Sequence, residues 1–132
     1  MAIFLLDTTL IVDAINDKLG RAELLDELLG QHNLLACCSI NVTEVYAGMR
    51  PHEAELTEAF LRSLRFYDVT WEIARHAGEL KSQWAKKGQT IALPDITIAA
   101  VAIAYGLTLI TDNRKYFPMP ELQLFSLPEH PK

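Results

Sequence analysis

The sequence predicts an α/β protein, a three-layer α/β/α sandwich with a parallel sheet of about five strands. Short apolar runs alternate along the chain with longer segments in which apolar residues recur at helical spacing. The apolar runs lack polar alternation, which is typical of strands buried on both faces, as in parallel sheets. One helical segment, residues 95–105, is apolar nearly all round, so we expect it to lie deep against the sheet.

The first half of the chain predicts two strands and four helices. Residues 2–6 form a continuous apolar run, and Gly20 separates the two helical segments that follow it. Pro51 is a favourable first residue for the last of these helices. In chain order, the predicted elements are a strand at 2–6, helices at 8–16 and 21–30, a strand at 33–38, and helices at 41–48 and 51–64.

The second half predicts a strand at 66–69 and then two further helices. Gly88 is expected to end the helix that begins at Trp71, and Gly106 the apolar helix that begins at Pro94-Asp95. Two further strands are expected at 107–110 and 122–125, which completes the sheet.

Size and composition predict one domain spanning residues 1–132, half of which are hydrophobic. The uncharged stretch at 96–111 falls short of a membrane span, and a Tyr105-Gly106 break divides it. The adjacent Cys37 and Cys38 are expected to be reduced core residues. These features predict a cytoplasmic protein with no membrane association.

Four acids occupy positions where a parallel sheet places its functional site. Asp7 and Asp112 directly follow predicted strands, Glu44 lies one turn into a helix that follows a strand, and Asp95 begins the apolar helix. Because sites in such sheets lie beyond the carboxyl ends of the strands, we expect these acids to converge.

Each acid also has a purely structural interpretation. Asp7 could cap the helix at Thr8, and Glu44 could complete a capping box with Asn41. Asp95 could cap the helix after Pro94 or stabilise the positive end of the helix dipole, and Asp112 could belong to a turn. A cap can also lie beside a metal ion, so these interpretations do not exclude a functional site.

Together the four acids indicate a site for divalent metal. Clustered carboxylates repel one another, and hard Mg²⁺ or Mn²⁺ ions prefer oxygen ligands. Such a site suits phosphodiester hydrolysis, because metal can activate a water and stabilise charge on the phosphate. The net charge of −5 argues mildly against a basic nucleic-acid binder, but without the four acids 13 acids remain against 12 Lys and Arg.

Four segments in order resemble the motifs of PIN-domain ribonucleases, especially the VapC-type toxins of bacterial toxin–antitoxin pairs. The segments are residues 4–9 (Phe-Leu-Leu-Asp-Thr-Thr), 39–48 (Ser-Ile-Asn-Val-Thr-Glu-Val-Tyr-Ala-Gly), 94–100 (Pro-Asp-Ile-Thr-Ile-Ala-Ala) and 109–113 with Phe117. The resemblance spans the whole chain. It implies a metal-dependent endoribonuclease, a homodimer and a cognate antitoxin that inserts a peptide near the acidic site.

The resemblance also implies roles for individual residues. Asp7 and Asp95 become the leading metal ligands, and Glu44 completes the site or positions a water. In the fourth motif the family's usual position holds Asn113, and the acid is Asp112, one place earlier. Either Asp112 turns inward as a fourth catalytic acid, or Asn113 supports the site as a neutral partner.

Two nearby residues would assist these acids. Thr111 is expected to hold the loop or a water through its hydroxyl. Arg114 and the neighbouring Lys115 are the first candidates to contact RNA phosphates.

Two other functions remain open. A haloacid-dehalogenase-type phosphatase would use Asp7 as nucleophile, but it needs a second acid two residues later, where this chain has Thr9. A non-catalytic PIN-like domain that binds RNA or a partner is the other alternative. Asp7, Glu44 and Asp95 argue against it, because an uncompensated acid cluster destabilises a scaffold.

Overall fold

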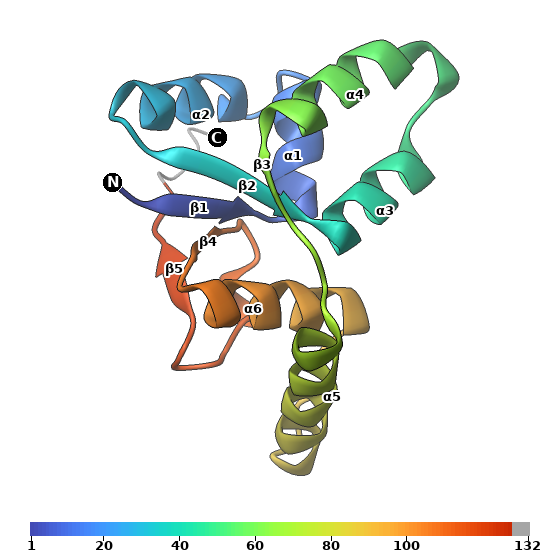
Figure 1. Cartoon of the computed structure of the whole chain (residues 1–132), viewed down its shortest axis with the longest axis vertical. Coiled ribbons are helices and arrows are strands. Elements are labelled where there is room, and N and C mark those ends of the chain that lie inside the picture. The colour runs from blue at the N-terminus through green and yellow to red at the C-terminus, as the bar shows by residue number, and fades with distance from the viewer. Residues whose placement is uncertain (128–132) are drawn as a thin grey trace.

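Five parallel strands form one sheet at the centre of the computed structural model, which describes residues 1–127 of the predicted domain (Figure 1). The remaining residues, 128–132, lie outside the described part. The strands are β1 (Ile3–Leu6), β2 (Leu34–Cys38), β3 (Arg65–Tyr67), β4 (Thr108–Ile110) and β5 (Gln123–Phe125). Their spatial order is β3-β2-β1-β4-β5, and every neighbouring pair is parallel. The predicted fold class is therefore confirmed.

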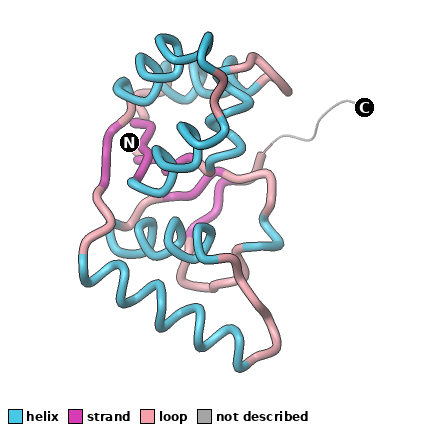
Figure 2. Tube along the Cα trace, turned by 90° about the vertical axis from the view of Figure 1, so that its right-hand side faces the viewer, coloured by secondary structure: helices cyan, strands magenta, loops and turns pink. Residues whose placement is uncertain are grey.

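Helices cover both faces of the sheet, as Figures 1 and 2 show. One face carries α1 (Thr8–Ile15), α2 (Arg21–Gly30), α3 (Ser39–Gly48) and α4 (Ala54–Ser63). The other face carries α5 (Trp71–Lys86) and α6 (Leu93–Tyr105), which pack against each other. Two short 3-10 turns, η1 (Pro51–Glu53) and η2 (Arg114–Tyr116), complete the described elements.

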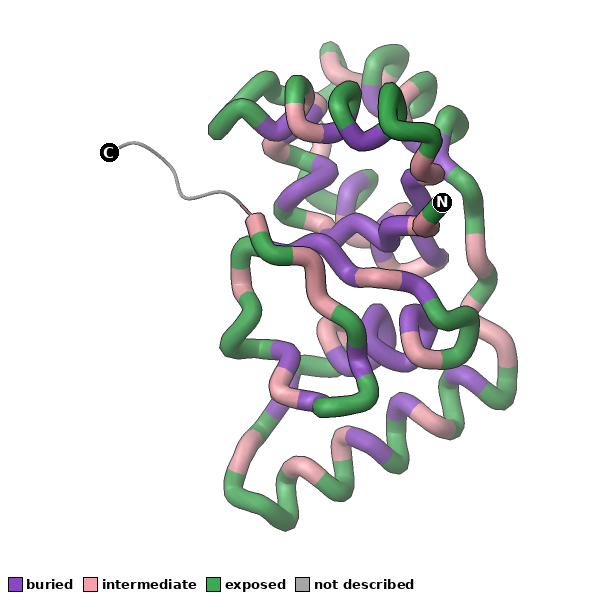
Figure 3. Tube along the Cα trace, turned by 90° about the vertical axis from the view of Figure 1, so that its left-hand side faces the viewer, coloured by how far each residue is buried: buried purple, intermediate pink, exposed green. Residues whose placement is uncertain are grey.

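The alternation of side chains along the strands divides the core into two layers. Phe4 and Leu6 face the α1–α4 layer, and Leu5 between them faces α5 and α6. Cys37 and Cys38 divide in the same way, and both are free and almost fully buried. The buried stretches follow the strands and the inner sides of the helices, as Figure 3 shows. This double burial explains why the strands are apolar without alternation.

The apolar helix lies where its composition predicted. Residues 96–102 of α6 are all buried, and Gly106 ends the helix in the left-handed region with φ of 64°. A residue with a Cβ adopts that conformation less readily, so Gly106 suits the abrupt turn into β4. The helix packs across the sheet with the α5 helix outside it.

Three predicted elements differ most from the structure, and several others differ by one residue at one end. The helix expected at 51–64 begins as a 3-10 turn, in which Glu53 N donates to Arg50 O at 2.9 Å. The strand expected at 66–69 is Arg65–Tyr67, because its pairing with β2 ends where β2 ends, at Cys38↔Tyr67. The helix expected to open at Asn41 already begins at Ser39.

The sheet has its topological switch point between β1 and β4. From β1 the chain proceeds to β2 and β3 on one side, and it later returns to β4 and β5 on the other. In sheets of this type a crevice forms beyond the carboxyl ends of the two strands that flank the switch. Asp7 and Thr111 follow those two strands, and Asp7 N donates to Ile110 O at 3.0 Å. Within residues 1–127, no helix is long and apolar enough to cross a membrane.

Candidate metal-dependent active site

Asp7 is the buried centre of the site. It is 5% exposed and is the N-cap of α1, where its Oδ1 accepts from Thr8 N at 2.8 Å. Its Oδ2 accepts from the Thr111 hydroxyl at 2.6 Å. The structural interpretation of Asp7 as a cap is therefore correct, and each carboxylate oxygen keeps lone pairs for a further partner.

The environment of Asp7 opposes its negative charge. Burial raises the pKa of the Asp7 carboxyl above its ordinary value, and the nearby carboxylates of Glu44 and Asp112 raise it further. The hydrogen bonds from Thr111 and Thr8 act in the opposite direction. Within residues 1–127, Asp7 has no ion pair with a basic side chain. The charge is oriented by hydrogen bonds but is left uncompensated.

Glu44 is held by a chain of hydrogen bonds that joins α3 to α1. Its Oε1 accepts from the Thr8 hydroxyl at 2.7 Å, and that hydroxyl accepts from Asn41 Nδ2 at 3.0 Å. The fully buried Asn41 in turn accepts from Cys38 N through Oδ1 at 2.8 Å. The predicted capping box between Asn41 and Glu44 is wrong, because α3 begins at Ser39 and its N-cap is Cys38. Asn41 is instead the third residue of α3, and its side chain accepts from the backbone N–H of the N-cap.

Asp95 approaches the same place from the opposite face of the sheet. It lies in the first turn of α6, half-buried, and Ala92 rather than Asp95 is the N-cap. Burial raises the pKa of its carboxyl, and the charges of Asp7 and Glu44 raise it further. The structure thus brings Asp7, Glu44 and Asp95 together from three elements, although they are far apart in sequence.

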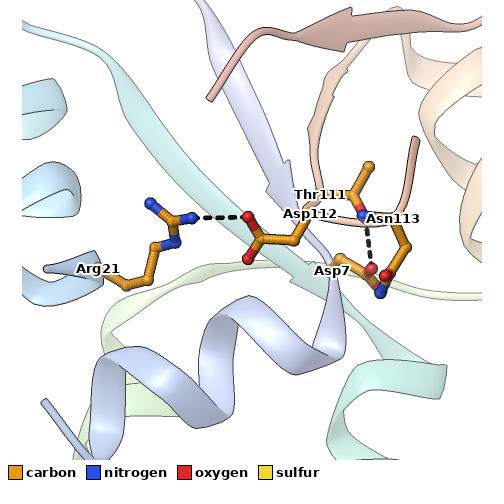
Figure 4. Close-up of polar contacts among 5 residues, drawn as sticks. All are labelled: Asp7, Arg21, Thr111, Asp112 and Asn113. Carbon is orange, nitrogen blue, oxygen red and sulfur yellow. Dashed lines mark hydrogen bonds and ion pairs between the residues drawn. The ribbon is translucent and has the colours of Figure 1, made fainter. Parts of the chain in front are cut away.

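Asp112 is the predicted site acid that the structure turns elsewhere. Its Oδ1 forms an ion pair with Arg21 Nη2 at 2.6 Å, and Figure 4 shows its carboxylate pointing toward Arg21 and away from Asp7. The Arg21 side chain is 4% exposed, and that of Asp112 is 30% exposed. The structure therefore does not show the alternative in which Asp112 turns inward toward the other acids.

The loop after β4 supports Asp7 through Thr111. Thr111 is 1% exposed, and its hydroxyl accepts from Asn113 N at 2.9 Å while it donates to Asp7. Asn113 thus supports the loop through its backbone. Arg114 reaches toward the end of β5, where its Nη1 lies 3.5 Å from both Phe125 O and Ser126 Oγ.

Sequence reasoning did not single out Arg21, or Thr8 as the anchor of Glu44. Arg21 follows a turn in which Asp17, Leu19 and Gly20 all have positive φ, and this turn folds the arginine inward. No periodicity reveals such a contact, because Arg21 and Asp112 are 91 residues apart. Thr8 offers only a weak signal, namely a hydroxyl beside a strand-end acid.

The donor set suits a hard divalent cation. The available groups are carboxylate oxygens from Asp7, Asp95 and Glu44, which Mg²⁺ and Mn²⁺ prefer. Within residues 1–127, no three His, Cys, Asp or Glu side chains are arranged to hold one ion by themselves. Mg²⁺ commonly binds through one or two carboxylates and keeps several waters, so the chemistry of this donor set suits it.

Comparison with known proteins gives one consistent family. The PIN domain model matches residues 4–120. Ribonuclease VapC19 of Mycobacterium tuberculosis is 36% identical over 120 residues, which are 90% of this chain and 96% of that protein. Ribonuclease VapC2 of Rickettsia felis is 32% identical over 120 residues, which are 87% of this chain and 90% of that protein.

Solved structures agree with the sequence matches. The structure of VapBC2 from Rickettsia felis, bound to a DNA fragment from the promoter, superposes with a TM-score of 0.82 and 32% identity. The match covers 93% of this chain and 97% of that one. The DNA-bound VapBC of Salmonella typhimurium gives a TM-score of 0.79 at 25% identity, covering 95% of this chain and 98% of that one.

Proposed function

This chain belongs to the PIN-domain family, and from that premise we propose that it is a divalent-metal-dependent endoribonuclease, the toxin of a type II toxin–antitoxin pair. The observation that carries the proposal is the convergence of Asp7, Glu44 and Asp95 at the switch point of the sheet, where none of them has an ion pair with a basic side chain of residues 1–127. The relatives named as ribonucleases support the substrate class. The solved VapBC complexes support a cognate antitoxin as the protein partner.

Asp7 and Asp95 hold the metal ion in this proposal. When bound, Mg²⁺ or Mn²⁺ would supply charge that activates the attacking water and stabilises the phosphate in the transition state. Burial, and then repulsion from neighbouring carboxylates, raises the pKa of both carboxyls, and a bound cation would offset this cost of their charged forms. Thr111 and the Thr8 amide keep Asp7 oriented before the ion arrives, which limits the reorganisation needed.

Glu44 positions the attacking water and accepts its proton. Its Oε1 is already engaged by the Thr8 hydroxyl, so Oε2 is the oxygen available to the water. The anchor from Thr8 and Asn41 holds the carboxylate in place, close enough to Asp7 and Asp95 for its charge to raise the pKa of both. We assign Asp112 and Asn113 to the support of the loop that carries Thr111, rather than to the metal.

The remaining parts of the proposal concern setting and assembly. The free thiols of Cys37 and Cys38 fit the reducing cytoplasm, where the RNA substrate lies. A homodimer follows from the family resemblance, and its test is the mass of the purified protein in solution.

The test is cleavage of a mixed RNA pool by purified protein. Wild type is expected to cut with Mg²⁺ or Mn²⁺ and to stop when a chelator is added. Asp7→Asn is expected to be inactive, because Asn keeps an oxygen for the Thr8 amide but loses the charge that binds metal. Asp26→Asn, the same change at an exposed residue of α2, is the matched control and should cut as wild type does.

Two results would contradict the proposal. Cleavage that survives both the chelator and Asp7→Asn would come from a contaminant or from another site. Binding of RNA without turnover under either metal would support the non-catalytic alternative.

A further inference from the structure

A small pocket opens beside Asp95, on the side of α6 that faces the end of η2. Its volume is about 300 Å³, and it is lined by residues 89–92, Asp95 and Tyr116. Asp95 is also close enough to Asp7 and Glu44 for their charges to raise its pKa. The pocket therefore adjoins the carboxylate site through Asp95, which lines the pocket and belongs to that site.

Tyr116 presents its ring at this pocket from an anchored turn. The turn η2 is closed by hydrogen bonds from Tyr116 N to Asn113 O and from Phe117 N to Arg114 O, both 2.9 Å. The neighbouring Phe117 is 2% exposed and fixes the turn in the core, whereas Tyr116 is 48% exposed. A half-exposed aromatic ring on a fixed turn can receive a flat partner at low entropic cost.

A cation lies over the ring, and an amide side chain lines the same pocket. Lys115 Nζ is 5.3 Å from the centroid of the Tyr116 ring. The half-buried Gln89 lines the pocket, and its side chain makes no hydrogen bond within residues 1–127. An aromatic ring, a lysine and an unengaged amide are the groups that recognise a nucleotide in a single strand, by stacking, phosphate contact and hydrogen bonding to the base edge.

We propose that Tyr116 and this pocket bind one nucleobase of the RNA, in the nucleotide next to the phosphodiester bond that is cleaved. The proposal rests on the ribonuclease function above and adds a substrate-binding subsite to it. Because Asp95 lines the same pocket, a base stacked on Tyr116 places its own sugar–phosphate beside the carboxylates. The pocket's volume is at the lower end for small-ligand sites, which suits one base and not a duplex.

Binding without cleavage is the direct test. In an Asp7→Asn background with chelator present, the dissociation constant is measured by fluorescence anisotropy with a labelled 12-nucleotide RNA of mixed sequence. Adding Tyr116→Ala is expected to raise it about tenfold, as the loss of one base–aromatic stack does. Adding Tyr116→Phe should change it less than about twofold, because the ring is retained.

Trp71→Ala is the matched control for removing an exposed aromatic side chain. Trp71 is 82% exposed and begins α5, a 16-residue helix whose far end leads into the pocket loop. At 1.5 Å per residue it lies about 20 Å along the helix from that loop, so its loss should leave RNA binding unchanged. Thermal unfolding of each variant checks that the fold is retained.

Cleavage kinetics give a second readout in the chain with its native Asp7. Tyr116→Ala should raise KM about tenfold and change kcat at saturating RNA by less than about threefold, because the stack contributes uniform binding. Gln89→Ala should reduce differences in affinity among 12-nucleotide oligo(A), oligo(C) and oligo(U) probes. If Gln89→Ala shows the same differences in affinity among these probes as the parent protein, Gln89 is not part of the subsite.

The outcomes separate this proposal from the proposed function. If wild type cleaves RNA and Tyr116→Ala alters neither the dissociation constant nor KM, the subsite is wrong and the ribonuclease stands. If wild type cleaves nothing but binding still depends on the Tyr116 ring, the RNA subsite stands and the catalytic function falls. Equal weakening by Tyr116→Ala and Trp71→Ala would also overturn the subsite.

Discussion

Asp7 and Asp112 follow neighbouring parallel strands, yet the fold treats them in opposite ways. Asp112 receives a buried partner from the same chain, the Arg21 guanidinium at 2.6 Å. Asp7 receives hydrogen bonds but no cation within residues 1–127, and two further acids approach it. The difference teaches that the fold pairs the acid that shapes the loop with a basic side chain, whereas Asp7, Glu44 and Asp95 have no ion pair within residues 1–127.

The largest difference is expected in activity. Asp7→Asn should lower kcat/KM at least about 1000-fold, because a catalytic metal supplies several kcal/mol of transition-state stabilisation. Asp112→Asn should lower it about tenfold or less, since Asn keeps an oxygen for Arg21 and the loop remains in place. The two rates are compared on the same RNA. Equal losses would mean that Asp112 also binds the metal, and the contrast between the two acids would disappear.

Metal should stabilise the protein through Asp7 and not through Asp112. At a concentration about 100-fold above its Kd, a bound ion adds roughly 2.7 kcal/mol to the free energy of unfolding. The midpoint of thermal unfolding should therefore be clearly higher with Mg²⁺ or Mn²⁺ than with chelator for wild type and Asp112→Asn. For Asp7→Asn the midpoint should differ little between these conditions. A metal response in Asp7→Asn equal to that of wild type would place the ion elsewhere.

The Arg21–Asp112 pair should contribute to stability. Arg21→Met leaves Asp112 without its cation, and we expect a loss of about 1 to 3 kcal/mol in the free energy of unfolding, less than for a fully buried pair because Asp112 is partly exposed. The double variant Arg21→Met, Asp112→Asn should lose less, since no uncompensated charge remains. Denaturant unfolding of wild type, the two single variants and the double variant measures the coupling free energy between Arg21 and Asp112.

The matched control for this change is Arg62→Met. Arg62 pairs with Glu58 at 3.8 Å on the exposed side of α4, with side chains 79% and 58% exposed. Exposed pairs of this kind contribute little, so its stability should match that of wild type. If Arg62→Met lowered the free energy of unfolding as much as Arg21→Met, the Arg21–Asp112 pair would contribute no more to stability than an exposed pair.

The smallest effect concerns the pH dependence of the metal-free protein. Because the pKa of Asp7 is raised in the folded state, Asp7 contributes stability below its unfolded pKa, and this is lost as pH rises through the folded pKa. In chelator, wild type should thus gain stability relative to Asp7→Asn as pH falls from 7 toward 4. Urea unfolding across this range checks the sign. If Asp7→Asn instead gained stability relative to wild type as pH falls, the result would contradict the argument that burial raises the pKa of Asp7.

Much of the arrangement of the candidate site was predictable because it depends on the order of elements. Asp7 follows an apolar run, Asp95 begins an apolar helix, and a parallel sheet brings such positions to one edge. The element types were also predictable, while the limits of β3 and the start of α3 were not. Those limits depend on where the partner strand ends and on which residue caps the helix, neither of which is local.

The sequence by itself determined the fold class and the convergence of Asp7, Glu44 and Asp95, because periodicity and position along the chain carry that information. Only the tertiary structure decided the direction of Asp112 and the anchoring of Glu44. These depend on contacts between Asp112 and Arg21, 91 residues apart, and between Glu44 and Thr8, 36 residues apart. A side chain's partner across such separations is set by packing geometry, which leaves no periodic trace in the sequence.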